Sequence, residues 1–323
     1  MSDLLTTPPS GSRVPPPRPF SGNGRQWSRQ PHHRRRRSAA GLLLLVILVI
    51  VVILVASGGG GGTQPVAVRG AGLLTRIQTL SGTGAGSFAY AETAAENAAI
   101  NRTLAYTPYV RVAGAQHREI ALTFDDGPGP YTTQVVSLLD QLNVPATFFE
   151  IGVSEQYFHQ GTSDVVAHGY TIGDHTYSHA PMSQLSPRDQ QSQLLQETKA
   201  IGKYGAPFPR LFRPPYGLWN NSTLALLHKY RMLMVLWTVD TSDYRLPGIS
   251  SITDSVVSGA QPGAIILMHD AGGNRTETIA ALPKIVEDLR AKGYRLVSVP
   301  KLLLDNPPPA NQNVSSIAGA GGG

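Results

Sequence analysis

Residues 119–128 read Glu-Ile-Ala-Leu-Thr-Phe-Asp-Asp-Gly-Pro, an apolar stretch that ends in two adjacent carboxylates and a turn. Farther along the chain, residues 175–179 read His-Thr-Tyr-Ser-His, with two imidazoles four positions apart. Two neutral imidazoles and one carboxylate form a three-ligand set for a divalent metal ion, with coordination positions left open for water and substrate. The second carboxylate need not bind the metal and can accept a proton. The two segments therefore indicate a metal-assisted hydrolase.

Short apolar runs alternate with helical patterns around these segments, which predicts a mainly parallel sheet wrapped by helices. We expect strands at 119–124, 146–151, 171–173, 210–212, 233–239, 264–268 and 295–299. We expect helices near 132–142, 187–203, 219–229, 249–258 and 275–291. The polar motifs fall at or just after the carboxyl ends of the strands, which is the active-site face of a (β/α) barrel.

Composition narrows the classes of function. The chain has 323 residues and no cysteine, which excludes a disulfide framework, a lipid-modified cysteine and a thiolate zinc site. Its formal net charge is +6, but residues 1–40 hold eight arginines and one acid, so that segment carries +7 and the rest of the chain −1. A basic surface for nucleic acid is therefore not indicated.

The basic segment leads into a hydrophobic one. Residues 39–56 carry no charge, and Leu42 to Val55 is an unbroken aliphatic run. As a helix these eighteen residues span roughly 27 Å at 1.5 Å per residue, close to the ~30 Å hydrocarbon core of a bilayer. The arginines before it favour a cytoplasmic tail and an extracytoplasmic catalytic domain. We expect a retained single-pass anchor in the cell membrane; secretion after signal cleavage near Ala56 is the alternative.

We expect five parts along the chain. Residues 1–38 form a disordered basic cytoplasmic tail, and 39–57 form a transmembrane signal-anchor. Residues 58–112 form a Gly- and Ala-rich tether and stalk with one helical pattern, at 88–104. Residues 113–304 form the catalytic domain, and 305–323 form a disordered Pro- and Gly-rich tail.

Residues 115–304 resemble the polysaccharide deacetylase family, also called the NodB-homology or carbohydrate esterase family 4 domain. The resemblance rests on five ordered motifs, at 123–128, 175–179, 213–216 (Arg-Pro-Pro-Tyr), 240–244 (Asp-Thr-Ser-Asp-Tyr) and 267–269 (Leu-Met-His). The family fold is a distorted, incomplete (β/α) barrel. In this chain we expect that α/β fold to be preceded by a single N-terminal transmembrane helix.

The resemblance implies a metal site. It assigns Asp126, His175 and His179 as ligands of a divalent ion, usually Zn²⁺, with Co²⁺ or other divalent ions in relatives. Such an ion polarises an acetamide carbonyl and acidifies its bound water. Asp125 would be the general base, and Arg213 would hold it ionised and lower its pKa.

The resemblance also implies the residues around the leaving group and the acetyl group. His269 would protonate the departing amine, and Asp243 would keep that imidazole charged and aligned. The expected substrate and oxyanion contacts are the backbone N–H of Tyr216, the acetyl pocket at Leu267, the aromatic wall at Tyr244, and Pro215. Tyr244 is a departure, because the family commonly has tryptophan there.

The implied activity is metal-dependent hydrolysis of N-acetyl groups on an extracytoplasmic polysaccharide. Peptidoglycan N-acetylglucosamine is the first expected substrate; chitin-type oligosaccharides, poly-N-acetylglucosamine and acetylxylan are alternatives.

A non-catalytic glycan-binding domain is an alternative from another class of protein. Such a domain should lack metal ligands or the base, and all of these residues are present here. An iron-dependent oxygenase also uses two histidines and one carboxylate. It usually carries its first histidine and carboxylate close together on a β-sandwich, whereas here the carboxylate comes first on an α/β chain. The sequence does not predict the oligomeric state.

Overall fold

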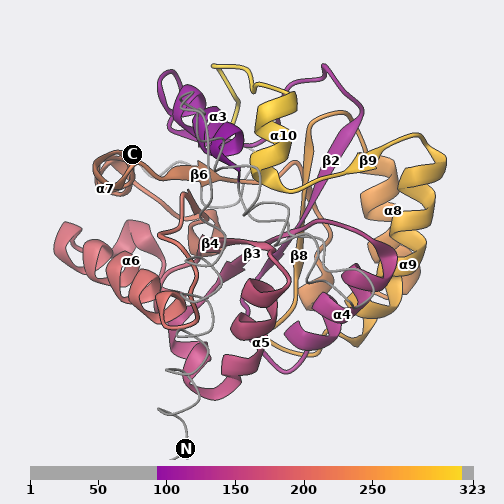
Figure 1. Ribbon diagram of the computed structural model, residues 1–323, viewed down its shortest axis with the longest axis horizontal. Coiled ribbons are helices and arrows are strands. Elements are labelled where there is room, and N and C mark those ends of the chain that lie inside the picture. Colours follow the sequence, from indigo (N-terminus) through magenta and orange to yellow (C-terminus); the bar gives the residue numbers. More distant parts are fainter. Residues whose placement is uncertain (1–92, 315–323) are drawn as a thin grey trace, which may run out of the picture. The chain divides into compact units, whose positions relative to one another are not determined.

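The computed structural model describes residues 93–314 (Figure 1). The expected cytoplasmic tail, the expected anchor at 39–57 and most of the expected tether lie outside the described residues, as does the chain after residue 314. Within the described part, none of the helices combines the length and the apolar character needed to cross a bilayer.

A parallel sheet of nine strands forms the centre of residues 93–314. Its strands are β1 (Tyr109–Val110), β2 (Glu119–Asp125), β3 (Thr147–Glu150), β4 (Thr171–Asp174), β5 (Leu211–Phe212), β6 (Leu233–Val235), β7 (Val239–Asp240), β8 (Ala264–His269) and β9 (Arg295–Leu296). Eight strands follow the order β1-β6-β5-β4-β3-β2-β8-β7, and β9 pairs with the start of β2. All the strand pairs are parallel.

The sheet curls without closing. Strand β6 lies near one end of the order and β7 at the other, yet only residues 236–238 separate them in sequence. The N–H of Leu236 donates to Val110 and the N–H of Thr238 donates to Ile265, so this short link joins the two ends of the sheet. Among the described residues β1 and β7 do not pair. The result is an incomplete (β/α) barrel, as predicted.

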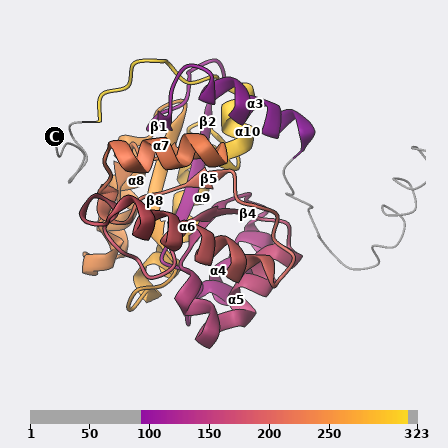
Figure 2. The same ribbon diagram turned by 90° about the vertical axis from the view of Figure 1, so that its left-hand side faces the viewer.

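Helices cover the sheet (Figures 1 and 2). They are α3 (Ala94–Leu104), α4 (Thr132–Leu142), α5 (Glu155–Ala167), α6 (Pro187–Gly202), α7 (Asn221–Tyr230), α8 (Ile249–Gly259), α9 (Thr276–Ala291) and α10 (Val299–Asp305). Both views place α3 and α10 side by side at one end of the strands, where they pack on each other.

Alternation along β2 places the first carboxylate inside the barrel. All seven residues of β2 are buried, as is usual for a parallel sheet covered on both faces. Ile120, Leu122 and Phe124 join a hydrophobic core with residues of α4, α8 and α9. Ala121 belongs to a second core, which includes residues of α3 and α10. Because side chains alternate along a strand, Asp125 shares the face of Ala121.

Most predicted elements are present, and two predicted strands are wrong in part. The five predicted helices begin and end within two residues of α4, α6, α7, α8 and α9. The single strand predicted at 233–239 is two strands, β6 and β7, because residues 236–238 cross to β8. The strand predicted at 295–299 ends at Leu296, because the Ser298 side chain accepts from the N–H of Lys301 and caps α10.

The described chain also differs from the predicted boundaries near residues 112 and 304. Helix α3 and strand β1 precede residue 113 but belong to the fold, since β1 pairs with β6. Asn306 is buried, and its side chain donates to Glu119. The side-chain oxygen of Gln312 accepts from the N–H groups of Arg111 and Val112. Residues 305–314 therefore pack on the domain.

Candidate active site

The side chains with expected chemistry meet at the carboxyl ends of the strands. Asp125 ends β2, His269 ends β8, and the two are register partners on adjacent strands. His175 directly follows β4, and Arg213 directly follows β5. Asp243 begins the short helix η4 (Asp243–Arg245), which follows β7. Motifs far apart in sequence thus converge at one end of the barrel, as the parallel topology predicts.

Asp126, His175 and His179 form a cluster that fits a metal ion. One ligand atom from each lies within 4.8 Å of the other two. Nε2 of His179 is 3.2 Å from Oδ1 of Asp126, and Nε2 of His175 is 3.7 Å from the same oxygen. That oxygen is buried and accepts no hydrogen bond from any residue that the structure describes. Three electron-pair donors therefore surround one point, and a divalent cation would satisfy the buried carboxylate oxygen.

The second nitrogen of each imidazole orients its ring. Nδ1 of His175 is 2.7 Å from the carbonyl oxygen of Arg213, and donation there leaves Nε2 as the free lone pair. Nδ1 of His179 is 3.1 Å from the hydroxyl of Tyr216. Burial lowers the pKa of His175 to about 3, so this ring is neutral at physiological pH, as a metal ligand must be.

The backbone conformation at three residues also orients their side chains in the site. Asp126 has φ 72°, His179 has φ 55° and Tyr216 has φ 60°. These left-handed values are uncommon outside glycine and recur at functional sites, where the surrounding structure holds them.

Arg213 orients Asp125. Its Nη1 donates to Oδ1 of Asp125 at 2.7 Å and to the hydroxyl of Thr123 at 2.8 Å. The guanidinium also lies 4.1 Å from the ring centroid of Phe149. Oδ2 of Asp125 remains on the side of the metal cluster, 3.7 Å from Nε2 of His175. One carboxylate oxygen is thus fixed by the arginine, and the other faces the place where substrate would react.

The lowered pKa predicted for Asp125 is wrong for the protein alone. Burial raises the pKa of this carboxyl, and the positive charges of Arg213 and His269 do not cancel that effect. The charge of a bound divalent ion would act in the same direction as Arg213.

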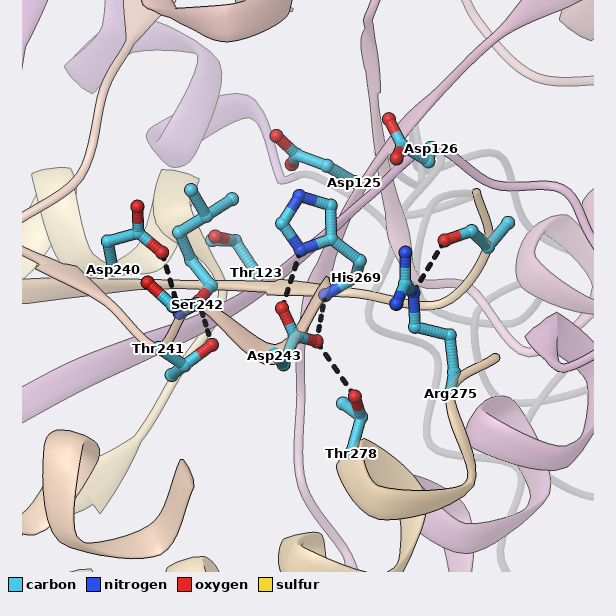
Figure 3. Close-up of polar contacts among 12 residues, drawn as sticks. Thr123, Asp125, Asp126, Asp240, Thr241, Ser242, Asp243, His269, Arg275 and Thr278 are labelled. Atoms are coloured by element: carbon cyan, nitrogen blue, oxygen red, sulfur yellow. Dashed lines mark hydrogen bonds and ion pairs between the residues drawn. The ribbon is translucent and has the colours of Figure 1, made fainter. Parts of the chain in front are cut away.

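His269 and Asp243 form a second charged pair (Figure 3). Nδ1 of His269 is 2.7 Å from Oδ1 of Asp243, and the backbone N–H of His269 donates to Oδ2 at 2.9 Å. The hydroxyl of Thr278, on α9, also donates to Oδ2 at 2.8 Å. Burial opposes both charges, but the hydrogen bond and the mutual attraction prevail. The pKa of His269 is raised and that of Asp243 is lowered.

Three of the four expected substrate contacts lie in one pocket of about 720 Å³, within the ~300–1,000 Å³ range of ligand sites. Leu267, Tyr216 and Tyr244 line it, and the ring of Tyr244 meets the ring of His269 edge-on at 5.4 Å between centroids. Pro215 does not line the pocket; it is buried at the start of the short helix η3 (Pro215–Gly217), and Pro214 lines the pocket instead.

Sequence reasoning missed several functional positions. Phe158 and Arg275 line the pocket, and Thr278 bonds Asp243. Phe158 lies at a kink inside α5, and the buried residues of that helix are mostly polar or glycine, so its sequence gives little apolar signal. Thr278 lies in the first turn of α9, and its partner Asp243 lies 35 residues earlier in the chain. No local sequence pattern therefore connects the two residues.

Four further carboxyl groups are buried close to one another. Glu150, Glu155, Asp174 and Glu197 are each at most 2% exposed. Six of their oxygens are buried and have no hydrogen-bond partner in the described part of the chain. Burial raises the pKa of all four, that of Glu155 to about 8. The folded protein therefore keeps protons on these groups to a higher pH than it would on exposed carboxyls.

The comparisons with known proteins agree with this geometry. The sequence model of the family described as polysaccharide deacetylase matches residues 113–235. A peptidoglycan-N-acetylglucosamine deacetylase of Bacillus cereus is 40% identical over 187 residues, which are 57% of this chain and 87% of that protein. A chitooligosaccharide deacetylase of a Bradyrhizobium species is 34% identical over 199 residues, which are 57% of this chain and 90% of that protein.

A solved structure has the same fold. The crystal structure of a peptidoglycan N-acetylglucosamine deacetylase in complex with a hydroxamate-type benzamide superposes with a TM-score of 0.59 at 30% identity. The match covers 64% of this chain and 96% of that one.

Proposed function

This chain belongs to the polysaccharide deacetylase family, and we propose that it hydrolyses the N-acetyl groups of peptidoglycan N-acetylglucosamine. The observation that carries the proposal is the cluster of Asp126, His175 and His179 with a separate carboxylate, Asp125, beside it. The imidazole of His269, which pairs with Asp243, lies on the neighbouring strand. A non-catalytic glycan-binding protein has no need of this complete set.

Asp126, His175 and His179 would hold the divalent ion, for which we propose Zn²⁺. Nitrogen and carboxylate donors in a set of three suit zinc and leave open positions. When bound, such an ion polarises the acetyl carbonyl and makes a nearby water more acidic.

The other residues of the site then divide the proton transfers. Oδ2 of Asp125 accepts a proton from the attacking water, while Arg213 holds Oδ1. The protonated His269 gives a proton to the departing amine, and Asp243 stabilises its positive charge. The backbone N–H of Tyr216 would donate to the oxyanion. Leu267 and Tyr244 border the space for the acetyl methyl group.

We propose that the protein is anchored in the cell membrane with its catalytic domain outside. The support is the uncharged segment at 39–57 after a run of four arginines. Protease added to intact spheroplasts should remove the domain and spare the arginine-rich tail. A domain that stays protected until lysis would contradict this orientation, and quantitative release into the medium would favour signal cleavage.

The test of activity is acetate release from purified peptidoglycan, chitooligosaccharides, poly-N-acetylglucosamine and acetylxylan. We expect release from peptidoglycan that stops with a chelator and returns with Zn²⁺. Asp125→Asn serves as the folded, inactive control. Chelator-resistant acetate release would contradict the metal-dependent mechanism, and activity confined to acetylxylan would contradict the proposed substrate.

A further inference from the structure

Arg275 is an arginine at the edge of the active-site pocket with no role in the chemistry above. Arg275 directly precedes α9, and only 2% of its surface is exposed. Nε donates to the carbonyl of Ala271 at 2.6 Å, and Nη1 donates to the carbonyl of Asn274 at 3.0 Å. Figure 3 shows the guanidinium extending from α9 toward the part of the site that contains Asp126 and His269.

The charge of Arg275 has no counterion in the described part of the chain. Its two hydrogen-bond acceptors are neutral carbonyls, and no Asp or Glu among residues 93–314 forms an ion pair with it. Buried arginines are normally paired, because removing the charge from water is unfavourable unless an anion compensates for it. Arg275 is thus a buried cation without an ion-pair partner among the described residues, although three carboxylates, of Asp125, Asp126 and Asp240, also line the pocket.

The guanidinium of Arg275 keeps a free N–H donor beside the pocket. Within residues 93–314 Nη2 makes no hydrogen bond, yet it is not among the buried polar atoms that lack a partner. Arg275 is among the residues that line the pocket. Arg275 is also the one Lys or Arg among the pocket-lining residues of the described chain. Asp240, an acid of the pocket, lies on the opposite side of His269 in Figure 3.

We propose that Arg275 recognises a carboxylate carried by the glycan next to the sugar that is deacetylated. This inference rests on the proposed deacetylase function and deepens it. Chitooligosaccharides are uncharged before deacetylation, whereas peptidoglycan carries carboxylates on its muramic acid residues and stem peptides. A guanidinium with a free N–H donor suits a carboxylate, and the bond is charge-assisted. The arginine therefore selects an anionic glycan over a neutral one.

The test compares three substrates that differ in charge. The first is peptide-free peptidoglycan strands with free lactyl carboxylates, the second is the same strands with those carboxylates converted to methylamides, and the third is chitotetraose. Wild-type protein should deacetylate the charged strands with a kcat/KM at least about 10-fold above the amidated strands, since one charge-assisted bond is lost. An equal kcat/KM on both would overturn the proposal without any variant.

Arg275→Gln isolates the residue. It should lower kcat/KM on the charged strands about 10-fold or more, mainly through KM, and leave the amidated strands and chitotetraose within about twofold. Arg188→Gln removes the same charge from an exposed position on α6 and should change none of the three. Metal content and the thermal midpoint of each variant report whether the loop at 271–275 is intact.

Other outcomes separate the possible failures. Equal losses on all three substrates in Arg275→Gln would assign the arginine to loop structure alone and overturn the inference. Unchanged kinetics on the charged strands would do the same. Wild-type protein that releases no acetate from any of the three would contradict the proposed deacetylase function itself.

Discussion

Asp125 and Asp126 are adjacent in sequence but have different surroundings. Asp125 is 3% exposed, continues the strand and is bound by Arg213. Asp126 leaves the strand with φ 72° and turns a free oxygen toward His179. One peptide bond therefore separates a proton acceptor from a metal ligand, and their variants should fail in different ways.

Asp126→Asn should lose metal and activity together, because an amide is a weaker, neutral ligand. Asp125→Asn should keep stoichiometric metal while turnover falls at least ~10²-fold, because only the base is removed. Metal analysis of the purified proteins and acetate release measure the two effects. The opposite pattern, with metal lost only in Asp125→Asn, would exchange the two assignments.

The charged pair of His269 and Asp243 predicts the alkaline side of the pH–rate profile. A general acid must carry its proton, so the rate falls as pH rises through the pKa of His269. Asp243 raises that pKa, so Asp243→Asn should move the alkaline limb to lower pH and reduce the maximal rate. Thr278→Val removes one bond to Asp243 but no charge, and it should move the limb much less. An alkaline limb that is the same in Asp243→Asn would show that His269 is not the acid.

The loop between β8 and α9 forms a wall beside the metal ligand. Gly272 has φ 73°, and a Cβ built there would lie 2.3 Å from Oδ2 of Asp126. Gly205 has a similar φ of 86°, but a Cβ there would meet no atom within 4 Å. The two glycines thus carry comparable backbone strain on substitution and differ in what the new methyl group meets.

The new methyl group of Gly272→Ala should displace the Asp126 carboxylate. Metal binding should therefore weaken at least ~10-fold, as it does when a residue that orients a metal ligand is changed. Both substitutions should lower the thermal midpoint by similar amounts, because both place a side chain at positive φ. Gly205→Ala should nevertheless leave metal affinity unchanged. Competition with a chromophoric chelator measures the affinity. Equal metal affinity in the two variants would mean that the loop yields and does not position Asp126.

Much of this architecture follows from local patterns, and the exceptions have physical causes. The start of helix α6 is predicted by Ser186, which caps it, and by Pro187, its first residue. Helix α5 contains Gly161 and many polar residues, so its burial depends on contacts with the loop at Pro128, which no local pattern encodes. The ligands and the base stand in recognisable motifs. Phe158 and the buried glutamates acquire their surroundings only when distant segments pack together.

The four buried carboxyls make the stability of the whole domain depend on pH. Their pKa values in the folded state are raised, so the folded protein holds protons that the unfolded chain releases above about pH 4.5. The free energy of unfolding should therefore decrease as pH rises from about 4.5 to about 8, the folded value for Glu155.

Thermal unfolding between pH 5.5 and 8.5, with metal saturating, measures this slope. Glu155→Gln should raise the midpoint at pH 8 and flatten the dependence, because an amide needs no proton to be neutral. Glu287→Gln changes a carboxyl that is 72% exposed and should leave the slope as it is. A midpoint that rises with pH over this interval would contradict the raised pKa values.

The open barrel has a further consequence for behaviour at high concentration. A sheet that does not close has two free borders, and a long free border can pair with the backbone of another molecule and start aggregation. Here the strands at the borders, β1 and β7, are each two residues long. They offer few unpaired N–H and C=O groups, so the open sheet presents little backbone for edge-to-edge association.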